Sequence, residues 1–416
     1  LYVDTRIGMH MGEYPMYPDR NVILVILDTV RKDFFDEYAT RIQGRSDTSF
    51  DNCRSASTWS VPSHASIFTG ELPSKHRINA ETFDRGKTFR DIRNNTFLSS
   101  MDCRTVGYSA NPYANSLFGF DLLFEEYTDF IAHESIFPAG LSPYEYYERA
   151  DKRNWRQKVN LLQACLLHEY PGRSLLNTLW SVAGVDLSER PLPKFTDDGA
   201  KAITGAASEV GSGLEPFFCF INYMDAHIPL RNTIHFDDNV HSVPNTWTSD
   251  DIHKWEVNKD GIWTEEFFEQ YRALYAAAID YLDRQVINLV DAVNAQTDRE
   301  TTVVVTADHG HNLGFPSENR LIHHDGSASE GVLHVPLEII NPPEGYPECV
   351  EGLFSHLSLG NLITNLHAEE QWDVGLVQKE IPAEVIGLGG TGDPRDYREF
   401  AEGEYEHWNR IIRCVY

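Results

Sequence analysis

The sequence predicts an α/β protein in which a doubly wound, alkaline-phosphatase-like sheet lies between layers of helices. Three stretches rich in aliphatic and β-branched residues indicate strands that are buried on both faces, at 21–28, 216–227 and 301–312. Helical patterns lie between these stretches, and an alternation of strands and helices is typical of this architecture.

Each of the three predicted strands ends in an aspartate, a histidine or both. NVILVILD ends in Asp28, PFFCFINYMDAH ends in His227, and TTVVVTADHGHN carries Asp308 and His309. Ligands of open α/β sheets bind beyond the carboxyl ends of the strands. Three strand ends that carry acid and imidazole groups therefore predict one shared site.

Helices are expected between the strands. Residues 264–296 have apolar side chains at three-and-four spacing over many turns, which predicts a long amphipathic helix. Weaker helical patterns cover 87–101 and 144–168, and RTVGYSA at 104–110 indicates a further strand. The polar stretch 232–261 predicts a long loop over the strand end at His227.

One catalytic domain with a small C-terminal unit is the expected organisation. A chain of 416 residues is long enough for one large α/β domain and a smaller attached unit. The regular pattern weakens after 355–367, so we expect a catalytic domain over 1–368 and a C-terminal subdomain over 369–416, with its completeness left open.

Composition limits the environment and the partners. The 63 acidic residues against 35 basic ones give a net charge of −28, which repels nucleic acid and anionic lipid. Acidic excess with few lysines resembles the proteins of salt-loving archaea, so we expect a concentrated-salt cytoplasm, with an ordinary acidic protein as the alternative. The chain has no apolar run of the ~18 residues that a transmembrane segment needs, and the six cysteines form no CxxC pair.

The motif SVPSHASIFTG at 60–70 resembles the signature of the sulfatase family, within the alkaline phosphatase superfamily. Five further stretches match the family in its order along the chain: ILDTVRKD, GELP, FINYMDAHIPL, TADHGHNLG and HHDGSASEGVLHVPLEII. The resemblance covers most of the chain. It implies a metal-dependent hydrolase of an anionic ester, with a sulfuric ester as the family's substrate.

Ester hydrolysis of this kind needs a cation for the anionic oxygens, an in-line nucleophile and a proton donor for the leaving oxygen. Asp28, Asp308 and His309 are ligand types that can meet around one divalent ion. Ser60 is expected at the N-terminus of a helix begun by Pro62, where the helix dipole favours an anion. For Asp28 alone, a turn or helix-cap role is the alternative.

Other site residues follow from the resemblance. His227 matches a residue that contacts the substrate's anionic group or protonates its leaving oxygen, with a surface histidine as the alternative. His324 matches a lysine or histidine that touches substrate. Asn111 lies in a region where many sulfatases carry a lysine near the site, and it is expected to bind substrate without that positive charge.

The chain also departs from the family pattern. Sulfatases oxidise the first signature residue to formylglycine, and a signature arginine guides that step; here these positions hold Ser60 and His64. His64 is expected to position the serine or to shuttle a proton, with a helix-surface role as the alternative. Thr29 replaces a second acid, and His309 replaces an asparagine. Nitrogen among the ligands favours zinc or manganese, while calcium stays open.

The sequence is consistent with three functions. They are a sulfate ester hydrolase, a phosphate or phosphonate ester hydrolase or phosphotransferase that uses unmodified Ser60, and a non-catalytic binding protein with the same fold. The expected partner is a small anionic ester on a sugar or a lipid headgroup. The metal, the alcohol and the oligomeric state stay open.

Overall fold

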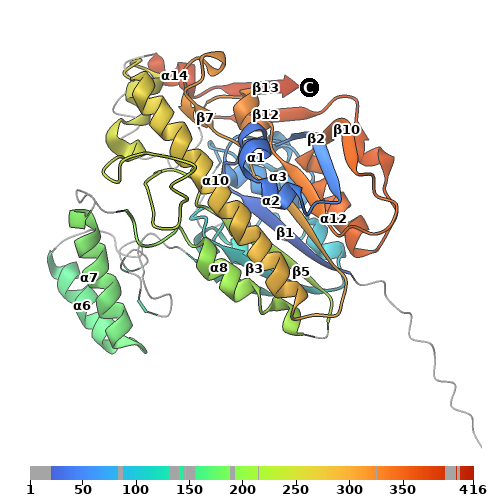
Figure 1. Cartoon of the computed structure of the whole chain (residues 1–416), viewed down its shortest axis with the longest axis horizontal. Coiled ribbons are helices and arrows are strands. Elements are labelled where there is room, and N and C mark those ends of the chain that lie inside the picture. Colours follow the sequence, from blue (N-terminus) through green and yellow to red (C-terminus); the bar gives the residue numbers. More distant parts are fainter. Residues whose placement is uncertain are drawn as a thin grey trace, which may run out of the picture.

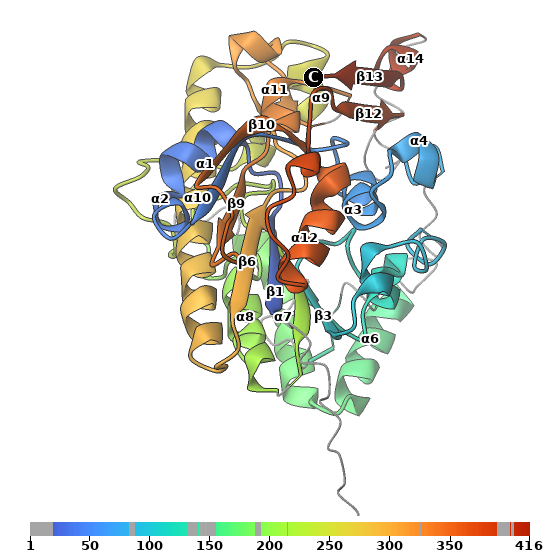
Figure 2. The ribbon, with the colours of Figure 1, turned by 90° about the vertical axis from the view of Figure 1, so that its right-hand side faces the viewer.

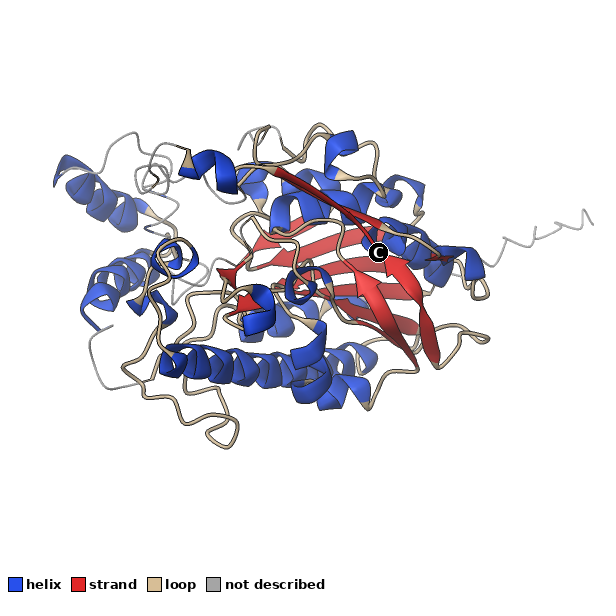
Figure 3. Cartoon of the chain, turned by 90° about the horizontal axis from the view of Figure 1, so that it is seen from above, coloured by secondary structure: helices blue, strands red, loops and turns tan. Residues whose placement is uncertain are grey.

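The computed structural model describes residues 20–416 except for 83–87, 131–139, 142, 144–145, 147–154, 188–192, 214, 325, 389–399 and 401–402. A nine-stranded sheet forms the centre, in the order β11-β10-β2-β9-β6-β1-β5-β3-β4. Figure 3 shows this sheet between helices on both sides. The strands are β1 (Asn21–Leu27), β2 (Thr48–Arg54), β3 (Arg104–Ser109), β4 (Glu126–Asp129), β5 (Phe217–Tyr223), β6 (Thr301–Thr306), β9 (Leu337–Ile340), β10 (Cys349–Ser355) and β11 (Val377–Gln378).

The sheet is mixed. The five strands from β4 to β6 in this order are parallel. β9 is antiparallel to both of its neighbours, β6 and β2, and β11 is antiparallel to β10. The predicted α/β fold is confirmed, and its parallel half contains the three strands that the sequence indicated.

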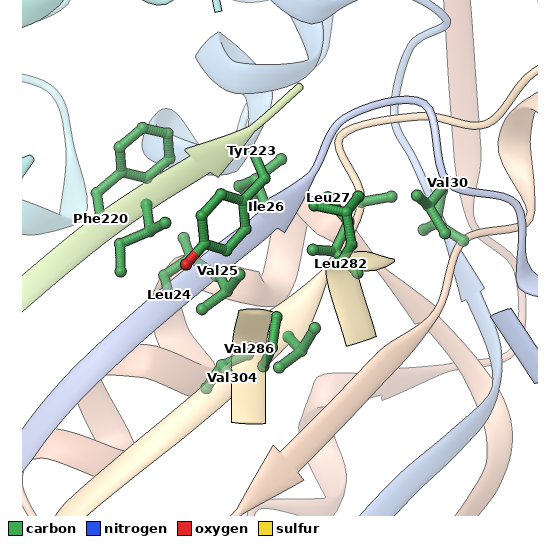
Figure 4. Packing of buried hydrophobic residues seen from close by; sticks show 14 of the residues in the cluster. Leu24, Val25, Ile26, Leu27, Val30, Phe220, Tyr223, Leu282, Val286 and Val304 are labelled. Atoms are coloured by element: carbon green, nitrogen blue, oxygen red, sulfur yellow. The ribbon is translucent and has the colours of Figure 1, made fainter. Parts of the chain in front are cut away.

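β1 lies at the middle of the core. All of its residues are buried, and it pairs with β5 on one side and with β6 on the other. Figure 4 shows its side chains among Phe220 and Tyr223 of β5, Val304 of β6, and Leu282 and Val286 of the long helix α10. A strand covered on both faces must be apolar throughout, which explains the run VILVIL.

Helices cover the two faces of the sheet (Figure 2). One face carries α10 (Glu265–Asn294), α8 (Ala200–Ala207), α1 (Lys32–Tyr38) and α2 (Thr40–Gln43), and the other carries α3 (Ser60–Thr69) and α12 (Leu359–His367). α10 confirms the predicted amphipathic helix, and the side chain of Thr264 caps it by accepting a hydrogen bond from the amide of Phe267 at 3.1 Å.

The remaining elements are short or lie outside the central layers. They are α4 (Pro73–His76), α6 (Trp155–Leu167), α7 (Pro171–Leu187), α9 (Lys254–Asn258), α11 (Glu330–Leu333), α14 (Glu404–Trp408), β7 (Asn312–Leu313), β8 (Ile322–His323), β12 (Pro382–Ile386) and β13 (Ile411–Val415). Among the described residues, no helix is both long and apolar enough to cross a bilayer. All six cysteines are free thiols.

One predicted helix is wrong. In the part of 87–101 that the structure describes, 88–101, the chain forms turns and a short 3₁₀ helix over Phe97–Ser100. Phe89, Ile92 and Leu98 are buried there, so packing of these side chains against the core overrides the weak helical pattern. The helix predicted over 144–168 is observed as α6, and most of 144–154 falls outside the described residues.

The C-terminal residues attach to the rest of the chain at two places. β11 extends the central sheet, and β12 pairs with β13 in a separate two-stranded sheet. Next to the signature helix, the hydroxyl of Ser57 donates to the carbonyl of Glu384 at 2.9 Å, and the amide of Glu384 donates to the carbonyl of Ala56 at 2.9 Å. These bonds hold β12 against the chain that leads into Ser60.

Candidate active site

Three ligand-type side chains converge at one edge of the sheet. Asp28 follows β1 directly, and Asp308 and His309 follow β6 after one further residue. β1 and β6 are adjacent and parallel, with Ile26 opposite Thr306, so both strands end at the same edge. One ligand atom from each of the three side chains lies within 4.8 Å of the others, and all three residues are buried. The predicted convergence is therefore observed.

Each of the three side chains keeps one buried atom without a hydrogen-bond partner. These atoms are Asp28 Oδ1, Asp308 Oδ2 and His309 Nε2. The other atoms of the last two side chains are engaged: Asp308 Oδ1 accepts from the amides of Thr29 and His309, and His309 Nδ1 lies 2.9 Å from the carbonyl of Gly310. A donating Nδ1 leaves the lone pair on Nε2, the form in which a histidine binds metal. Two carboxylate oxygens and one imidazole nitrogen thus fit a divalent cation.

The two carboxylates oppose each other electrostatically. Burial raises the pKa of Asp28 well above its usual range, and the charge of Asp308 raises it further. For Asp308, burial also opposes the charged form, but the imidazoles of His309 and His64 when protonated, together with hydrogen bonds such as that from the Thr29 amide, hold its pKa below the usual range. Two buried carboxylates at this separation resist ionising together. A bound cation would relieve that repulsion, which supports the fit of the site to a metal.

Thr29 holds the ligands through its backbone. Its φ of 62° lies in the left-handed region, which a β-branched residue rarely adopts, and strain of this kind clusters at functional sites. In this conformation its amide donates to Asp308 Oδ1 at 3.2 Å. Its hydroxyl donates to the carbonyls of Asp28 and Ala226, at 2.6 and 3.2 Å. Thr29 therefore orients the site and leaves its hydroxyl turned toward the main chain.

Ser60 is the first residue of α3, and its hydroxyl donates to Asp28 Oδ2 at 3.2 Å. The helix thus begins two residues before Pro62. A proline is accepted there because amides in the first turn of a helix have no partner within the helix. The hydroxyl of Ser60 lies at the positive end of a ten-residue helix and beside the candidate ligands.

His64 is buried one turn further along α3. Its Nδ1 lies 2.7 Å from the carbonyl of Ser60, and its ring packs edge-on against Phe120 and Phe220. Burial lowers the pKa of His64, so the ring is neutral at pH 7. A helix-surface role is wrong for this residue. Its contact with Ser60 fits a positioning role, and the prediction that it shuttles a proton remains untested.

Asn111 contacts the candidate metal site directly. Its amide nitrogen donates to Asp28 Oδ2 at 2.5 Å, and its amide oxygen accepts from the main-chain amide of Tyr113 at 2.8 Å. Asp28 Oδ2 therefore receives hydrogen bonds from both Asn111 and Ser60, which leaves Oδ1 for a metal. The structure gives Asn111 a role in orienting Asp28, and its predicted role in binding substrate remains untested.

A group of histidines adjoins the candidate ligands. The ring centroid of His324 lies 4.5 Å from that of His309, 6.1 Å from that of His227 and 6.0 Å from that of His311. Nδ1 of His324 is buried without a hydrogen-bond partner among the described residues. His227 is half-buried, and its Nδ1 lies 2.6 Å from the carbonyl of Ile228. His227 and His324, two of the residues predicted to contact substrate, thus lie side by side, and His324 adjoins His309.

His311 is a site residue that the sequence analysis did not assign. Its Nε2 lies 2.6 Å from the phenol oxygen of Tyr271 on α10, and its Nδ1 is buried without a partner among the described residues. Tyr275, one turn further along α10, donates to the carbonyl of Thr29 at 2.6 Å. The alternation of histidines in DHGH was a signal that His309 and His311 share one loop, but it does not reveal the tyrosine partner.

The comparisons with known proteins agree with the fold described above. Solved structures with a similar fold include the phosphonate monoester hydrolase of Silicibacter pomeroyi, with 17% identity, a TM-score of 0.54, and coverage of 95% of this chain and 85% of that chain. The phosphonate monoester hydrolase of Agrobacterium radiobacter has 14% identity, a TM-score of 0.56, and coverage of 95% and 89%. BT4656 in complex with its substrate D-glucosamine-2-N,6-O-disulfate has 13% identity, a TM-score of 0.54, and coverage of 88% and 84%. No curated protein matches the sequence. The Sulfatase family model matches residues 20–366, so the chain belongs to the sulfatase family.

Proposed function

We propose that this chain is a metal-dependent hydrolase of a small anionic ester and that Ser60 is its nucleophile. One observation carries the proposal: three buried ligand atoms without partners, from Asp28, Asp308 and His309, lie beside a serine hydroxyl at a helix N-terminus. Membership of the sulfatase family makes a sulfuric ester the first substrate class to test.

Separate residues of the site would bind the metal and accept the proton of the nucleophile. Asp28, Asp308 and His309 would hold one divalent cation, which when bound supplies positive charge for the ester oxygens and lowers the pKa of the serine hydroxyl. Zinc or manganese suits a ligand set with an imidazole nitrogen better than calcium does. Asp28 Oδ2 accepts the hydrogen bond of Ser60 and so can receive its proton.

The reaction has two steps. Ser60 Oγ forms a bond to sulfur or phosphorus while the bond to the leaving alcohol breaks, and His227 gives a proton to that alcohol. Water then gives a proton to His227 and its oxygen attacks the sulfur or phosphorus, while the bond to Ser60 Oγ breaks. Ser60 recovers its proton from Asp28, and the sulfate, phosphate or phosphonate leaves. His324, next to His309, would contact an oxygen of the anionic group.

A second substrate class is favoured by His64. A formylglycine hydrate can expel sulfate by collapsing to its aldehyde, whereas a serine sulfate must wait for water to attack it. The position of the signature arginine holds a neutral, buried histidine that contacts the Ser60 carbonyl. We therefore infer that Ser60 stays unmodified and that phosphate or phosphonate esters turn over faster than sulfate esters.

The test combines metal content with turnover. Ser60→Ala is expected to retain metal and to abolish turnover of p-nitrophenyl sulfate, phosphate and phosphonate esters. Ser66→Ala is the matched control, because Ser66 is buried in the same helix and contacts His76 instead of Asp28. Asp308→Ala is expected to lose both metal and turnover. Full metal occupancy in Asp308→Ala, or normal turnover in Ser60→Ala, contradicts the proposal.

The choice between ester classes needs its own measurement. Mass spectrometry of the peptide that contains Ser60 identifies a serine or a formylglycine. A formylglycine, or sulfate cleaved faster than phosphate and phosphonate, restores the sulfate ester assignment. A chain that binds no metal and cleaves none of the aryl esters is a binding protein with the sulfatase fold. The alcohol of the natural ester, on a sugar or a lipid headgroup, is then found by screening both classes.

A further inference from the structure

Two helices between β4 and β5 form a hairpin beside the central layers. α6 and α7 run side by side at the left of Figure 1, apart from the sheet. Cys165 of α6 contacts α7, with its Sγ 3.2 Å from the hydroxyl of Thr178 and 3.5 Å from the carbonyl of Ser174. Leu141 also contacts α7: its amide donates to the Ser174 hydroxyl at 2.9 Å, and its carbonyl accepts from the side-chain amide of Asn177 at 3.3 Å.

The polarity of this hairpin is reversed. Most of the buried residues of the hairpin are small or polar: Cys165, Ser174, Asn177 and Thr178 are buried, and Leu161 is the one buried leucine among the described residues of the two helices. Large apolar side chains face outward, and we call this set the apolar hairpin surface: Val159, Leu162, Leu166, Leu167, Tyr170, Leu176 and Leu179. Leu167 is 77% exposed and Leu179 is 64% exposed. Single exposed apolar residues are ordinary, but a group of seven on neighbouring turns marks a surface that meets an apolar environment.

The spacing shows that these residues form stripes. Val159, Leu162 and Leu166 are three and four positions apart, which places them on one face of α6. Leu176 and Leu179 are three positions apart and share a face of α7. Each helix therefore presents an outward apolar stripe, while small residues allow the two helices to approach closely, as they do in lipid.

The charge of the segment points to the occupant of this surface. The whole chain carries 63 acidic residues against 35 basic ones, but the two helices of the hairpin and their connection, residues 155–187, contain two acids, Glu169 and Asp186, and three basic residues, Arg156, Lys158 and Arg173. The net charge of the hairpin is therefore +1, so it does not share the repulsion of anionic lipid that we expected of the chain as a whole. Leucines combined with basic residues are typical of helices that lie in the interface of an anionic bilayer.

The lengths of the two helices indicate whether they could span a bilayer or would lie in its interface. α6 has 13 residues and α7 has 17. At 1.5 Å per residue they are about 20 and 26 Å long, shorter than the ~30 Å hydrocarbon core of a bilayer. We propose that the apolar hairpin surface docks the protein on a lipid surface that carries anionic headgroups, with both helices lying in the interface. This proposal concerns where the protein works and is independent of the ester that Ser60 cleaves.

Vesicle flotation tests the proposal. The full chain is mixed with vesicles of phosphatidylcholine alone or with phosphatidylglycerol added, in the lowest potassium chloride concentration at which circular dichroism shows a folded protein. We expect the protein to float with the phosphatidylglycerol vesicles and the Leu166→Asp/Leu167→Asp variant to bind at least tenfold more weakly. Val374→Asp is the matched control, because Val374 is 75% exposed and lies outside the hairpin. It should float like the parent, and all three proteins should keep the same metal content.

The same double variant also shows whether lipid or a second copy of the chain covers the apolar hairpin surface. Failure of the parent to float with either vesicle, or equal flotation of the double variant, overturns the proposal. Light scattering gives the mass of each protein in solution. If the parent is a dimer and the double variant is a monomer, a second copy of the chain covers the surface and the lipid proposal is wrong.

Discussion

Removal of the Asn111 amide should weaken the binding of metal more than the binding of substrate. Asn111 Nδ2 donates to Asp28 Oδ2 at 2.5 Å, and this bond fixes which oxygen of Asp28 remains free. A hydrogen bond to a charged group contributes about 1.5–3 kcal/mol. At about 1.4 kcal/mol per factor of ten, Asn111→Ala should raise the dissociation constant of the metal roughly 10- to 100-fold, the range found for groups that orient metal ligands.

The assay is competition for zinc or manganese against a chromophoric chelator, followed by kinetics at saturating metal. If Asn111 acts through Asp28, the metal affinity falls while KM at saturating metal stays within about twofold of the parent. Asn115→Ala is the control, because Asn115 lies in the same loop and its side chain accepts from the amide of Leu117 at 2.9 Å. Unchanged metal affinity together with a raised KM would refute this reasoning and would assign Asn111 to the substrate.

Two further predictions concern stability. Burial raises the pKa of Glu338 to about 7 from 4.5, so the folded state holds a proton that the unfolded state releases, and stability is lost as pH rises from about 4.5 to 7. Urea unfolding should therefore show that Glu338→Gln is more stable than the parent by up to about 3 kcal/mol at pH 8 and by little at pH 4.5. An equal difference in stability at both pH values contradicts the raised pKa of Glu338. With a net charge of −28, the thermal midpoint should also rise steeply as potassium chloride is raised into the molar range, and an unchanged midpoint removes the high-salt expectation.

The sequence predicted the parts of the site that depend on strand ends. β1 and β6 are buried along their whole length because both faces are covered, so the first charged residue after each strand marks the edge of the sheet. That rule was enough to place Asp28, Asp308 and His309 together. The long helix α10 was predictable for a similar reason, since its buried face repeats over thirty residues.

Hydrogen-bond partners across long separations were not predictable in this way. Asn111 and Asp28 are 83 positions apart, and Tyr271 and His311 are 40 apart. Their contacts depend on which strands and helices become neighbours, and residue type alone does not decide that. The left-handed backbone of Thr29 was hidden because threonine gives no local sign of it. The weak helical pattern at 87–101 failed because burial of a few aromatic and aliphatic residues decided the local structure.

The net charge of the metal-loaded site predicts whether it cleaves monoanionic or dianionic phosphorus esters faster. Two carboxylates, Asp28 and Asp308, would balance one divalent cation and leave the occupied site near neutral. Burial lowers the pKa values of His64, His311 and His324, and a nearby cation would lower them further, so these rings add no positive charge at pH 7. The proton that His227 gives to the leaving alcohol then adds one positive charge. A monoanionic ester balances that charge, so it enters at a lower electrostatic cost than a dianionic one.

The expected result is that a p-nitrophenyl phosphonate monoester or bis-p-nitrophenyl phosphate, each with one negative charge, has a higher kcat/KM at pH 8 than p-nitrophenyl phosphate, which has two. Lowering the pH toward 5.5 should narrow the gap, because protonation makes the phosphate monoester a monoanion as well. Parallel rates on the three substrates with the same metal-loaded protein provide the measurement. A dianion that remains the best substrate at pH 8 would mean that a positive charge besides that of His227 reaches the ester, and the argument that His64, His311 and His324 are neutral would then be wrong.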